Sequence, residues 1–161
     1  EPGEVEKWLD AKEAATLRQY FADQYALAEP LDADSQMAVQ DAIDHPEKYV
    51  LKPQREGGGN NLWMEEMKEA LQLKTMTIQE RSAYILMRRI MQKSFTSALM
   101  RRGKVQVGEC EKEVGIYASY LGGADEEYGK VIGHLMRTKL VGVNEGGVAS
   151  GYAVLDSPVL I

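Results

Sequence analysis

Apolar side chains at helical spacing predict that the chain begins with helices. They recur three or four positions apart in two groups: Val5, Trp8 and Leu9, and then Leu17, Tyr20 and Phe21. Asp10 followed by Glu13 is the pattern of a capping box, in which each residue satisfies a backbone N–H of the first turn. A second helix is therefore predicted to begin at this point.

The pattern is interrupted at Glu29-Pro30 and then resumes. Asp34 or Ser35 is expected to cap a third, short helix that runs through Ile43. His45-Pro46 ends it, because a residue before proline avoids the helical conformation. Residues 1–46 are therefore interpreted as a helical segment.

From residue 47 onward, short apolar runs replace the helical spacing. Runs with β-branched or aromatic side chains predict strands at residues 49–51, 84–87, 105–107, 116–121 and 152–155. Met64, Met67 and Leu71 fall on one face of a helix between the first two runs. Pro53 and the glycines that follow it are expected to exclude regular structure. Helices followed by several strands predict an α+β architecture.

Composition and charge narrow the function. The chain has 161 residues, 44% hydrophobic and 27% charged, as in an ordinary globular domain, and no apolar stretch reaches the ~18 residues of a membrane span. A net charge of −6 disfavours nucleic acid, and no aromatic residues are interleaved with Arg88-Arg89 or Arg101-Arg102. The lone cysteine, Cys110, is expected to be a buried, inert thiol, which suits a reduced compartment.

The two ends of the sequence suggest a piece of a longer protein. The chain starts at Glu1-Pro2-Gly3 without a methionine and stops on the apolar run 158–161. We therefore expect a fragment, and we expect any complete activity to need a further, N-terminal portion.

The segment from Lys52 to Asn61 carries the strongest chemical signal. Its consecutive glycines, Gly57, Gly58 and Gly59, let backbone N–H groups approach a ligand without obstruction. Lys52 and Arg55 supply positive charge for phosphate oxygens, and Glu56 offers a carboxylate for Mg²⁺. Asn60 and Asn61 add neutral donors and acceptors. No Gly-Lys-Ser/Thr follows, so this is not a Walker A loop, and a solvated linker is the alternative.

A second glycine-rich loop lies at residues 146–151, shortly after Arg137 and Lys139. A lone Arg-x-Lys is usually a solvated pair of side chains. Two glycine loops with nearby cations in one small chain favour an anionic ligand that carries phosphate.

The segment 52–61 resembles the glycine-triad loop of eukaryotic glutathione synthetases. The resemblance continues at residues 83–87, 113–117, 135–139 and 145–149, and through Asp156-Ser157, in the same order and at similar spacing. It covers the whole chain, weakly over the first 45 residues and strongly after residue 47. It implies an ATP-grasp fold with an antiparallel lid sheet, in which residues 1–46 belong to the main body and residues 47–161 form the lid and nucleotide-binding region.

The resemblance also implies a reaction. Enzymes of this family use ATP and Mg²⁺ to phosphorylate the cysteinyl carboxylate of γ-glutamylcysteine, and the amine of glycine then displaces phosphate. Such catalysis is mainly positioning and charge neutralisation. The family further implies a homodimer, and a cytoplasmic location is expected, although a secreted paralogue is also compatible with the sequence.

Carried over residue by residue, the resemblance assigns a nucleotide site. Its expected members are Lys52, Arg55, Gly57, Gly58, Gly59, Asn60, Asn61, Trp63, Met87, Arg88, Arg89, Ile90, Glu113, Lys139 and Glu145. The backbone of Met87 to Ile90 is implied to read the adenine edge, and Glu113 is implied to bind the ribose hydroxyls. Glu56 is the implied Mg²⁺ ligand.

The same comparison assigns the substrate site. Arg137 is implied to hold a substrate carboxylate and is the candidate catalytic residue, while Val148 and Ala149 are implied to line the acceptor pocket. Arg88 stands where many relatives have Glu or Gln, and Ser150 where alanine is more usual. These departures leave two alternatives open: a divergent relative with an altered acceptor or weakened catalysis, and a nucleotide-binding module without activity.

Overall fold

The computed structural model describes residues 3–55, 59–122 and 128–158. The chain divides into two compact units, residues 1–90 and residues 91–161. Each unit contains one antiparallel sheet, and all the helices of the described residues belong to the first unit. The α+β prediction is confirmed. Among the described residues, no helix has the length and apolar character needed to cross a bilayer.

The first unit is built on a three-stranded antiparallel sheet in the order β1-β3-β2. Its strands are β1 (Gln24–Ala26), β2 (Tyr49–Pro53) and β3 (Tyr84–Arg88). The central strand β3 places Leu86 opposite Tyr25 on one side and opposite Leu51 on the other. Because side chains alternate along a strand, this register fixes which residues share a face of the sheet.

The helices of this unit follow local sequence signals. They are η1 (Val5–Lys7), α1 (Ala11–Arg18), α2 (Ala33–Asp44), η2 (Pro46–Lys48), α3 (Met64–Leu71) and α4 (Ile78–Arg81). The predicted capping box at Asp10 and Glu13 is present at the start of α1. The predicted cap of α2, Asp34 or Ser35, was wrong: Asp32 caps this helix by accepting a 2.7 Å hydrogen bond from the Ser35 N–H.

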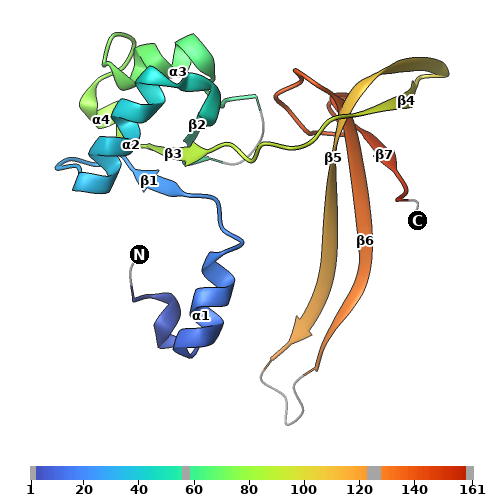
Figure 1. Ribbon diagram of the computed structural model, residues 1–161, viewed down its shortest axis with the longest axis horizontal. Coiled ribbons are helices and arrows are strands. Elements are labelled where there is room, and N and C mark those ends of the chain that lie inside the picture. The colour runs from blue at the N-terminus through green and yellow to red at the C-terminus, as the bar shows by residue number, and fades with distance from the viewer. Residues whose placement is uncertain (1–2, 56–58, 123–127, 159–161) are drawn as a thin grey trace. The chain divides into compact units, whose positions relative to one another are not determined.

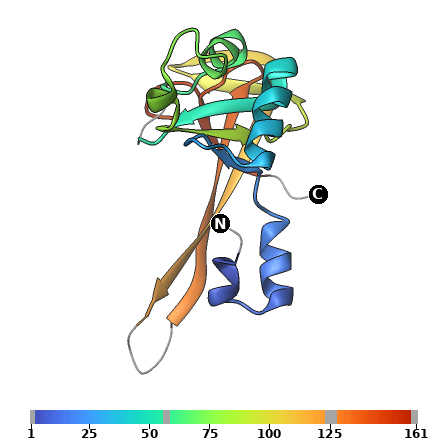
Figure 2. The same ribbon diagram turned by 90° about the vertical axis from the view of Figure 1, so that its left-hand side faces the viewer.

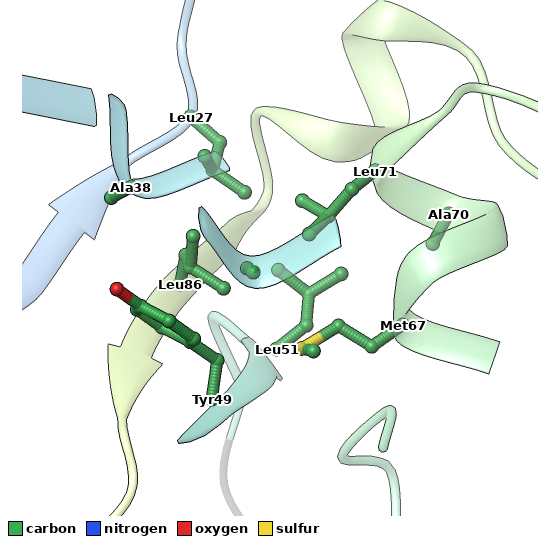
Figure 3. Packing of buried hydrophobic residues seen from close by; sticks show 9 residues of the cluster. Leu27, Ala38, Tyr49, Leu51, Met67, Ala70, Leu71 and Leu86 are labelled. Atoms are coloured by element: carbon green, nitrogen blue, oxygen red, sulfur yellow. The ribbon is translucent and has the colours of Figure 1, made fainter. Parts of the chain in front are cut away.

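The hydrophobic core of the unit lies between one face of the sheet and helices α2 and α3. Figure 3 shows Leu51 and Leu86 from the sheet pointing toward Leu27 and toward Met67 and Leu71. Leu51 and Leu86 are fully buried. Full burial of such a side chain contributes about 1.5–3 kcal/mol, so this cluster is the main stabilising feature of the unit.

The second unit is a four-stranded antiparallel sheet in the order β4-β5-β6-β7. Its strands are β4 (Phe95–Arg101), β5 (Lys104–Leu121), β6 (Tyr128–Leu140) and β7 (Val154–Asp156). Arg102 and Gly103 form the two-residue turn between β4 and β5, and both have positive φ, as the tightest hairpin turns require. Strands β5 and β6 continue past their neighbours as a long two-stranded ribbon (Figures 1 and 2).

Two further sequence expectations differ from this fold. Residues 105–107 and 116–121 were expected to form separate strands, but both belong to the 18-residue strand β5. Pro53 was expected to lie outside regular structure, but it ends β2, opposite Tyr84. Strand β1 pairs with β3 and so joins the helical segment to residues 47–90 within the first unit. The assignment of residues 1–46 to the main body and of residues 47–161 to the lid and nucleotide-binding region stays a prediction.

Candidate functional site

The glycine-triad segment leaves strand β2 and returns to it. Lys52 pairs with Ile85 inside the sheet, and the chain departs after Pro53. It comes back at Leu62, which exchanges backbone hydrogen bonds of 2.9 and 3.1 Å with Leu51. The segment between is therefore a loop with a closed base. Glu56, Gly57 and Gly58 lie outside the described residues.

One side-chain contact crosses this loop near its base. Arg55 Nη2 donates a 2.6 Å hydrogen bond to Oδ1 of Asn60. Asn60 and Asn61 are half-buried and both have interactions with other groups. The structure therefore brings two of the predicted nucleotide contacts together, one on each arm of the loop.

Lys52, in strand β2, is a cation that the described residues leave without a partner. Its side chain is half-buried, yet it makes no hydrogen bond or ion pair with any residue that the structure describes. Lys52 lies on the face of the sheet opposite to Leu51, because neighbouring residues of a strand point in opposite directions. An ammonium group held this way is suited to an anionic ligand, since a partly buried charge is stabilised by a counter-charge.

The predicted adenine-reading backbone continues from strand β3. The Arg88 N–H donates to the Asp23 carbonyl at 2.9 Å, and the Arg89 N–H donates to the Lys48 carbonyl at 2.8 Å. Ile90, exposed at 70%, makes no backbone hydrogen bond within the described part of the chain. Of these three residues, Ile90 therefore has the N–H available to a ligand.

Trp63 and Arg89 come together from different parts of the chain. The Arg89 guanidinium lies over the Trp63 indole, 5.3 Å from the ring centroid, and Arg89 Nη1 donates to the Glu47 carbonyl at 3.1 Å. Such cation–π contacts contribute about 0.5–1 kcal/mol at exposed sites. The indole, which precedes helix α3, is thereby held beside the end of β3.

The Arg88 side chain points to the other face of the sheet. It shares this face with Leu86 and opposes Tyr49, whose hydroxyl lies 3.3 Å from Arg88 Nη2. The Tyr49 hydroxyl in turn donates a 2.7 Å hydrogen bond to Asp41 of helix α2. Burial, followed by the neighbouring Asp41, raises the pKa of the Tyr49 phenol, so it remains a donor.

An open pocket of about 400 Å³ lies around Arg88 on this helix-facing side. Asp23 and Asp41 contribute carboxylates 3.7 and 3.6 Å from the guanidinium. Arg88 therefore links strands β1 and β2 to helix α2. The side chains of Arg88 and Lys52 therefore point to opposite faces of the sheet.

Asp41 should make the stability of this unit depend on acid. The hydroxyl of Tyr49, followed by His45, holds the pKa of the Asp41 carboxyl below its ordinary value. A depressed native pKa gives stability that is present above the unfolded pKa, near 3.9, and is lost as pH falls through the native pKa. We expect Asp41→Asn to flatten the loss of urea resistance below about pH 5. Tyr49→Phe should flatten it too; an unchanged acid limb in both variants would contradict this assignment.

In the second unit, strands β5 and β6 build a charged face. Glu113 lies opposite Arg137, and Glu111 lies opposite Lys139, so all four side chains point to the same side of the sheet. Arg137 Nη2 donates to Oε1 of Glu113. Lys139 Nζ lies 3.8 Å from Oε2 of Glu111 and donates to the Val143 carbonyl at 2.6 Å. Three predicted ligand contacts, Glu113, Arg137 and Lys139, thus share one surface.

The opposite face of these strands contains three buried residues. Cys110, Met136 and Thr138 lie there, and the Thr138 hydroxyl donates to Asp156 of β7 at 3.0 Å. Burial raises the pKa of the Cys110 thiol. The expectation of a buried Cys110 is confirmed, and its raised pKa fits an inert thiol.

The second glycine loop approaches the charged face. A methyl group placed on Gly146 would lie 3.8 Å from Cζ of Arg137, so the loop backbone passes beside this guanidinium. The loop is held by its own hydrogen bonds: the Gly147 carbonyl accepts from the N–H of Tyr152 at 2.9 Å and from the Ser150 hydroxyl at 3.2 Å. Val148 and Ala149, the predicted acceptor contacts, lie between these two anchors, while Glu145 precedes them and has an interaction partner.

Substitutions at Ser150 and Gly147 should have non-additive effects on the free energy of unfolding. A methyl group on Gly147 would lie 2.2 Å from the Ser150 Oγ but 3.6 Å from its Cβ. We therefore expect Gly147→Ala to displace the hydroxyl and to lower the free energy of unfolding by about 0.5–1.5 kcal/mol, the net value of one hydrogen bond. In a Ser150→Ala background the same substitution should cost little. Urea unfolding of the four proteins checks this, and equal costs in both backgrounds would refute the contact.

Sequence reasoning missed Glu111 and Gly146 as neighbours of the candidate site. The signal for Glu111 was present: Glu109, Glu111 and Glu113 alternate, as Arg137 and Lys139 do, which is the period of one strand face. The contact of Gly146 with Arg137 had no such signal, because it depends on the path of a loop. No group of three or more metal-binding side chains occurs among the described residues.

The chain was compared with known proteins. It matches the family described as eukaryotic glutathione synthase, ATP binding domain, over residues 1–160. It is 44% identical to glutathione synthetase of Xenopus laevis over 99% of its length and 43% identical to that of Homo sapiens over 98%. A chloroplastic glutathione synthetase of Solanum lycopersicum is also 44% identical.

These relatives are longer than the chain, which spans about a third of their length: 34% of the Xenopus protein and 33% of the human one. A solved structure of a glutathione synthetase-like effector from Globodera pallida, in its apo form, aligns with a TM-score of 0.67 at 23% identity. That alignment covers the whole chain and 32% of the effector, and it supports the fold. The chain belongs to the eukaryotic glutathione synthase family and corresponds to its ATP-binding domain, which has an ATP-grasp-like fold.

Proposed function

We propose that this chain binds ATP with Mg²⁺ and takes part in joining glycine to γ-glutamylcysteine. The observation that carries the nucleotide proposal is the half-buried ammonium of Lys52 beside strand β3, which has no hydrogen-bond or ion-pair partner among the described residues, in a chain of this family. Lys52 would bind phosphate oxygens, and the N–H of Ile90 would read the adenine edge. Trp63, held by Arg89, would contribute a flat apolar surface beside the base.

The assigned roles in the second unit follow the charged face. Glu113 would accept from the ribose hydroxyls, Lys139 would contact the nucleotide, and Arg137 would hold a substrate carboxylate. Glu145 would approach the nucleotide from the start of the second glycine loop. Glu56 would be a Mg²⁺ ligand, and the glycine triad would close over the phosphates. Mg²⁺, when bound, would neutralise charge on the transferring phosphoryl group.

We infer that the reaction passes through an acyl phosphate. The cysteinyl carboxylate takes the terminal phosphoryl group of ATP, which releases ADP and creates a leaving group. The glycine amine then attacks the carbonyl carbon, loses a proton and expels inorganic phosphate as the amide forms. Lys52 and Arg137 would hold the two anionic reactants in place, a positioning role that can supply several kcal/mol of rate acceleration.

The complete reaction would need the rest of the synthetase fold. We propose that an N-terminal portion supplies further ligands, that the whole enzyme acts as a homodimer, and that it works in the cytoplasm. A buried and unpaired thiol such as Cys110 suits a reducing compartment. Sedimentation of the full-length protein tests the dimer, and it would be rejected by a monomer at all concentrations.

The test of the function is ADP formation with γ-glutamylcysteine and a panel of amines. ADP release that depends on both substrates supports the ligase. Release with other amines and not with glycine supports an altered acceptor. Nucleotide binding without any ADP release contradicts the ligase and supports a binding module.

Ser150 is expected to have no part in choosing the acceptor. Its hydroxyl already donates to the Gly147 carbonyl, so it is engaged within the loop. Ser150→Ala should leave unchanged the ratio of kcat/KM values for glycine and for serine or β-alanine. A shift of several-fold in that ratio, which corresponds to about 1 kcal/mol, would place the hydroxyl in the acceptor pocket.

A further inference from the structure

Two residues with separate assigned roles form an ion pair across strands β5 and β6. Glu113 and Arg137 are directly opposite each other in the ladder, and Arg137 Nη2 donates to Oε1 of Glu113. Their side chains are 56% and 34% exposed. A ligand can therefore reach both groups.

Glu113 is the carboxylate that faces Arg137 directly across the two strands and pairs with it. The backbone of Gly146 passes beside the guanidinium, with the position of an added methyl 3.8 Å from both Cζ and Nη2. A glycine at this point contributes no charge. The next carboxylate along the same face, Glu111, lies beside Lys139 instead.

We propose that Glu113 couples the nucleotide site to the carboxylate site. In the free chain its carboxylate neutralises Arg137, so an incoming substrate carboxylate must compete for the guanidinium. When ribose hydroxyls donate to Glu113, this competition weakens and Arg137 becomes available. Nucleotide binding then strengthens substrate binding, and the order with nucleotide first is favoured. This inference rests on the proposed function and concerns the regulation of that same site.

The expected change in affinity follows from the exposure of the Glu113–Arg137 ion pair. Partly exposed ion pairs contribute little, and release of one such pair changes affinity by about two- to five-fold. Linkage requires the effect to be reciprocal, so the substrate must raise nucleotide affinity by the same factor. This gives two independent measurements of one quantity.

The decisive variant is Glu113→Gln. The amide oxygen still accepts hydrogen bonds from Arg137 and from ribose, so geometry is kept while the negative charge is removed. The matched control is Glu111→Gln, which removes the same charge from the neighbouring pair on the same face, two residues away. Thermal melting of the three full-length proteins checks that each is folded.

The experiment measures the affinity for γ-glutamylcysteine by calorimetry, with and without a saturating non-hydrolysable ATP analogue and Mg²⁺. In the wild-type protein and in Glu111→Gln, the analogue should tighten binding about two- to five-fold. In Glu113→Gln, γ-glutamylcysteine should bind more tightly than in the wild type even without nucleotide. Adding the analogue should then leave the affinity of this variant almost unchanged.

The outcomes are separable. An equal nucleotide effect in all three proteins overturns the coupling role of Glu113 and leaves the ligase proposal standing. Loss of the effect in Glu111→Gln as well overturns the assignment to this pair. Failure of the wild-type protein to bind γ-glutamylcysteine in any condition overturns the proposed function, and the coupling with it.

Discussion

Replacing Lys52 with alanine is expected to weaken ATP binding by about 1.5–3 kcal/mol, or roughly ten- to a hundredfold in Kd. The Lys52 ammonium has no partner among the described residues, so the substitution breaks no hydrogen bond or ion pair with them and removes the charge that the cation offers a ligand. Its loss should therefore appear in binding and not in stability.

The measurement is calorimetry of the full-length protein with ADP or a non-hydrolysable ATP analogue and Mg²⁺. Lys74→Ala is the matched control, because it removes the same charge from an exposed position just after helix α3. Equal affinities in wild type and Lys52→Ala would exclude Lys52 from the nucleotide site. An equal loss of affinity in Lys74→Ala would mean that the effect of Lys52→Ala comes from the change in net charge and not from a contact with the nucleotide.

Replacing Glu29 with alanine is expected to lower the free energy of unfolding of the first unit by about 2–4 kcal/mol. Arg81, at the end of α4, is buried, and its Nη2 donates to Oε1 of Glu29. The other carboxylate oxygen accepts from the Leu31 N–H at 3.1 Å. Without Glu29 the guanidinium would be a buried charge with its counter-ion gone, and its Nε already has no partner among the described groups.

Replacing the other partner of the ion pair, Arg81, should have a smaller effect on stability. Arg81→Met fills similar space and leaves Glu29, which is 43% exposed and free to be hydrated. Arg81→Met should lower the free energy of unfolding by only about 1 kcal/mol. Urea unfolding of Glu29→Ala and Arg81→Met shows which variant loses more stability. If Arg81→Met proved the more damaging change, burial of the guanidinium would not be the cause.

Local signals in the sequence predicted many elements of the first unit, but not α4 or η2. The capping box at Asp10 and Glu13 acts within one turn. The apolar runs at residues 49–51 and 84–87 form the expected strands; the first is buried, and in the second Leu86 is buried while its neighbours are half-buried. Strand β1 was missed because three residues give no periodicity. It exists through its pairing with β3, which no local pattern encodes.

The second unit was harder to predict, for a physical reason. Strand β5 reads as two strands because glycine and charged residues interrupt its apolar pattern between residues 108 and 113. Much of the β5–β6 ribbon has exposed side chains on both faces, so burial leaves no alternation to detect. Strands β4 and β6 were not predicted at all.

The candidate site shows the same division. A family resemblance assigned Glu113 and Arg137 separate roles, but their ion pair depends on the register between two strands. The orientation of Arg88 also needs knowledge of which sheet face is buried. Residues adjacent in sequence were predictable as a group; residues adjacent only in space were not.

The strand order β1-β3-β2 has a consequence for synthesis on the ribosome. The central strand is the last of the three in the sequence, so β1 and β2 have no shared partner until residues 84–88 have emerged. Until then, β1 and β2, which start about 25 residues apart in the sequence, stay unpaired with each other's partner strand, and their apolar faces are accessible to chaperones. The backbone at Met87 to Ile90 is put in place when β3 completes the sheet, so a nascent chain acquires its core and its proposed adenine-reading edge in a single step.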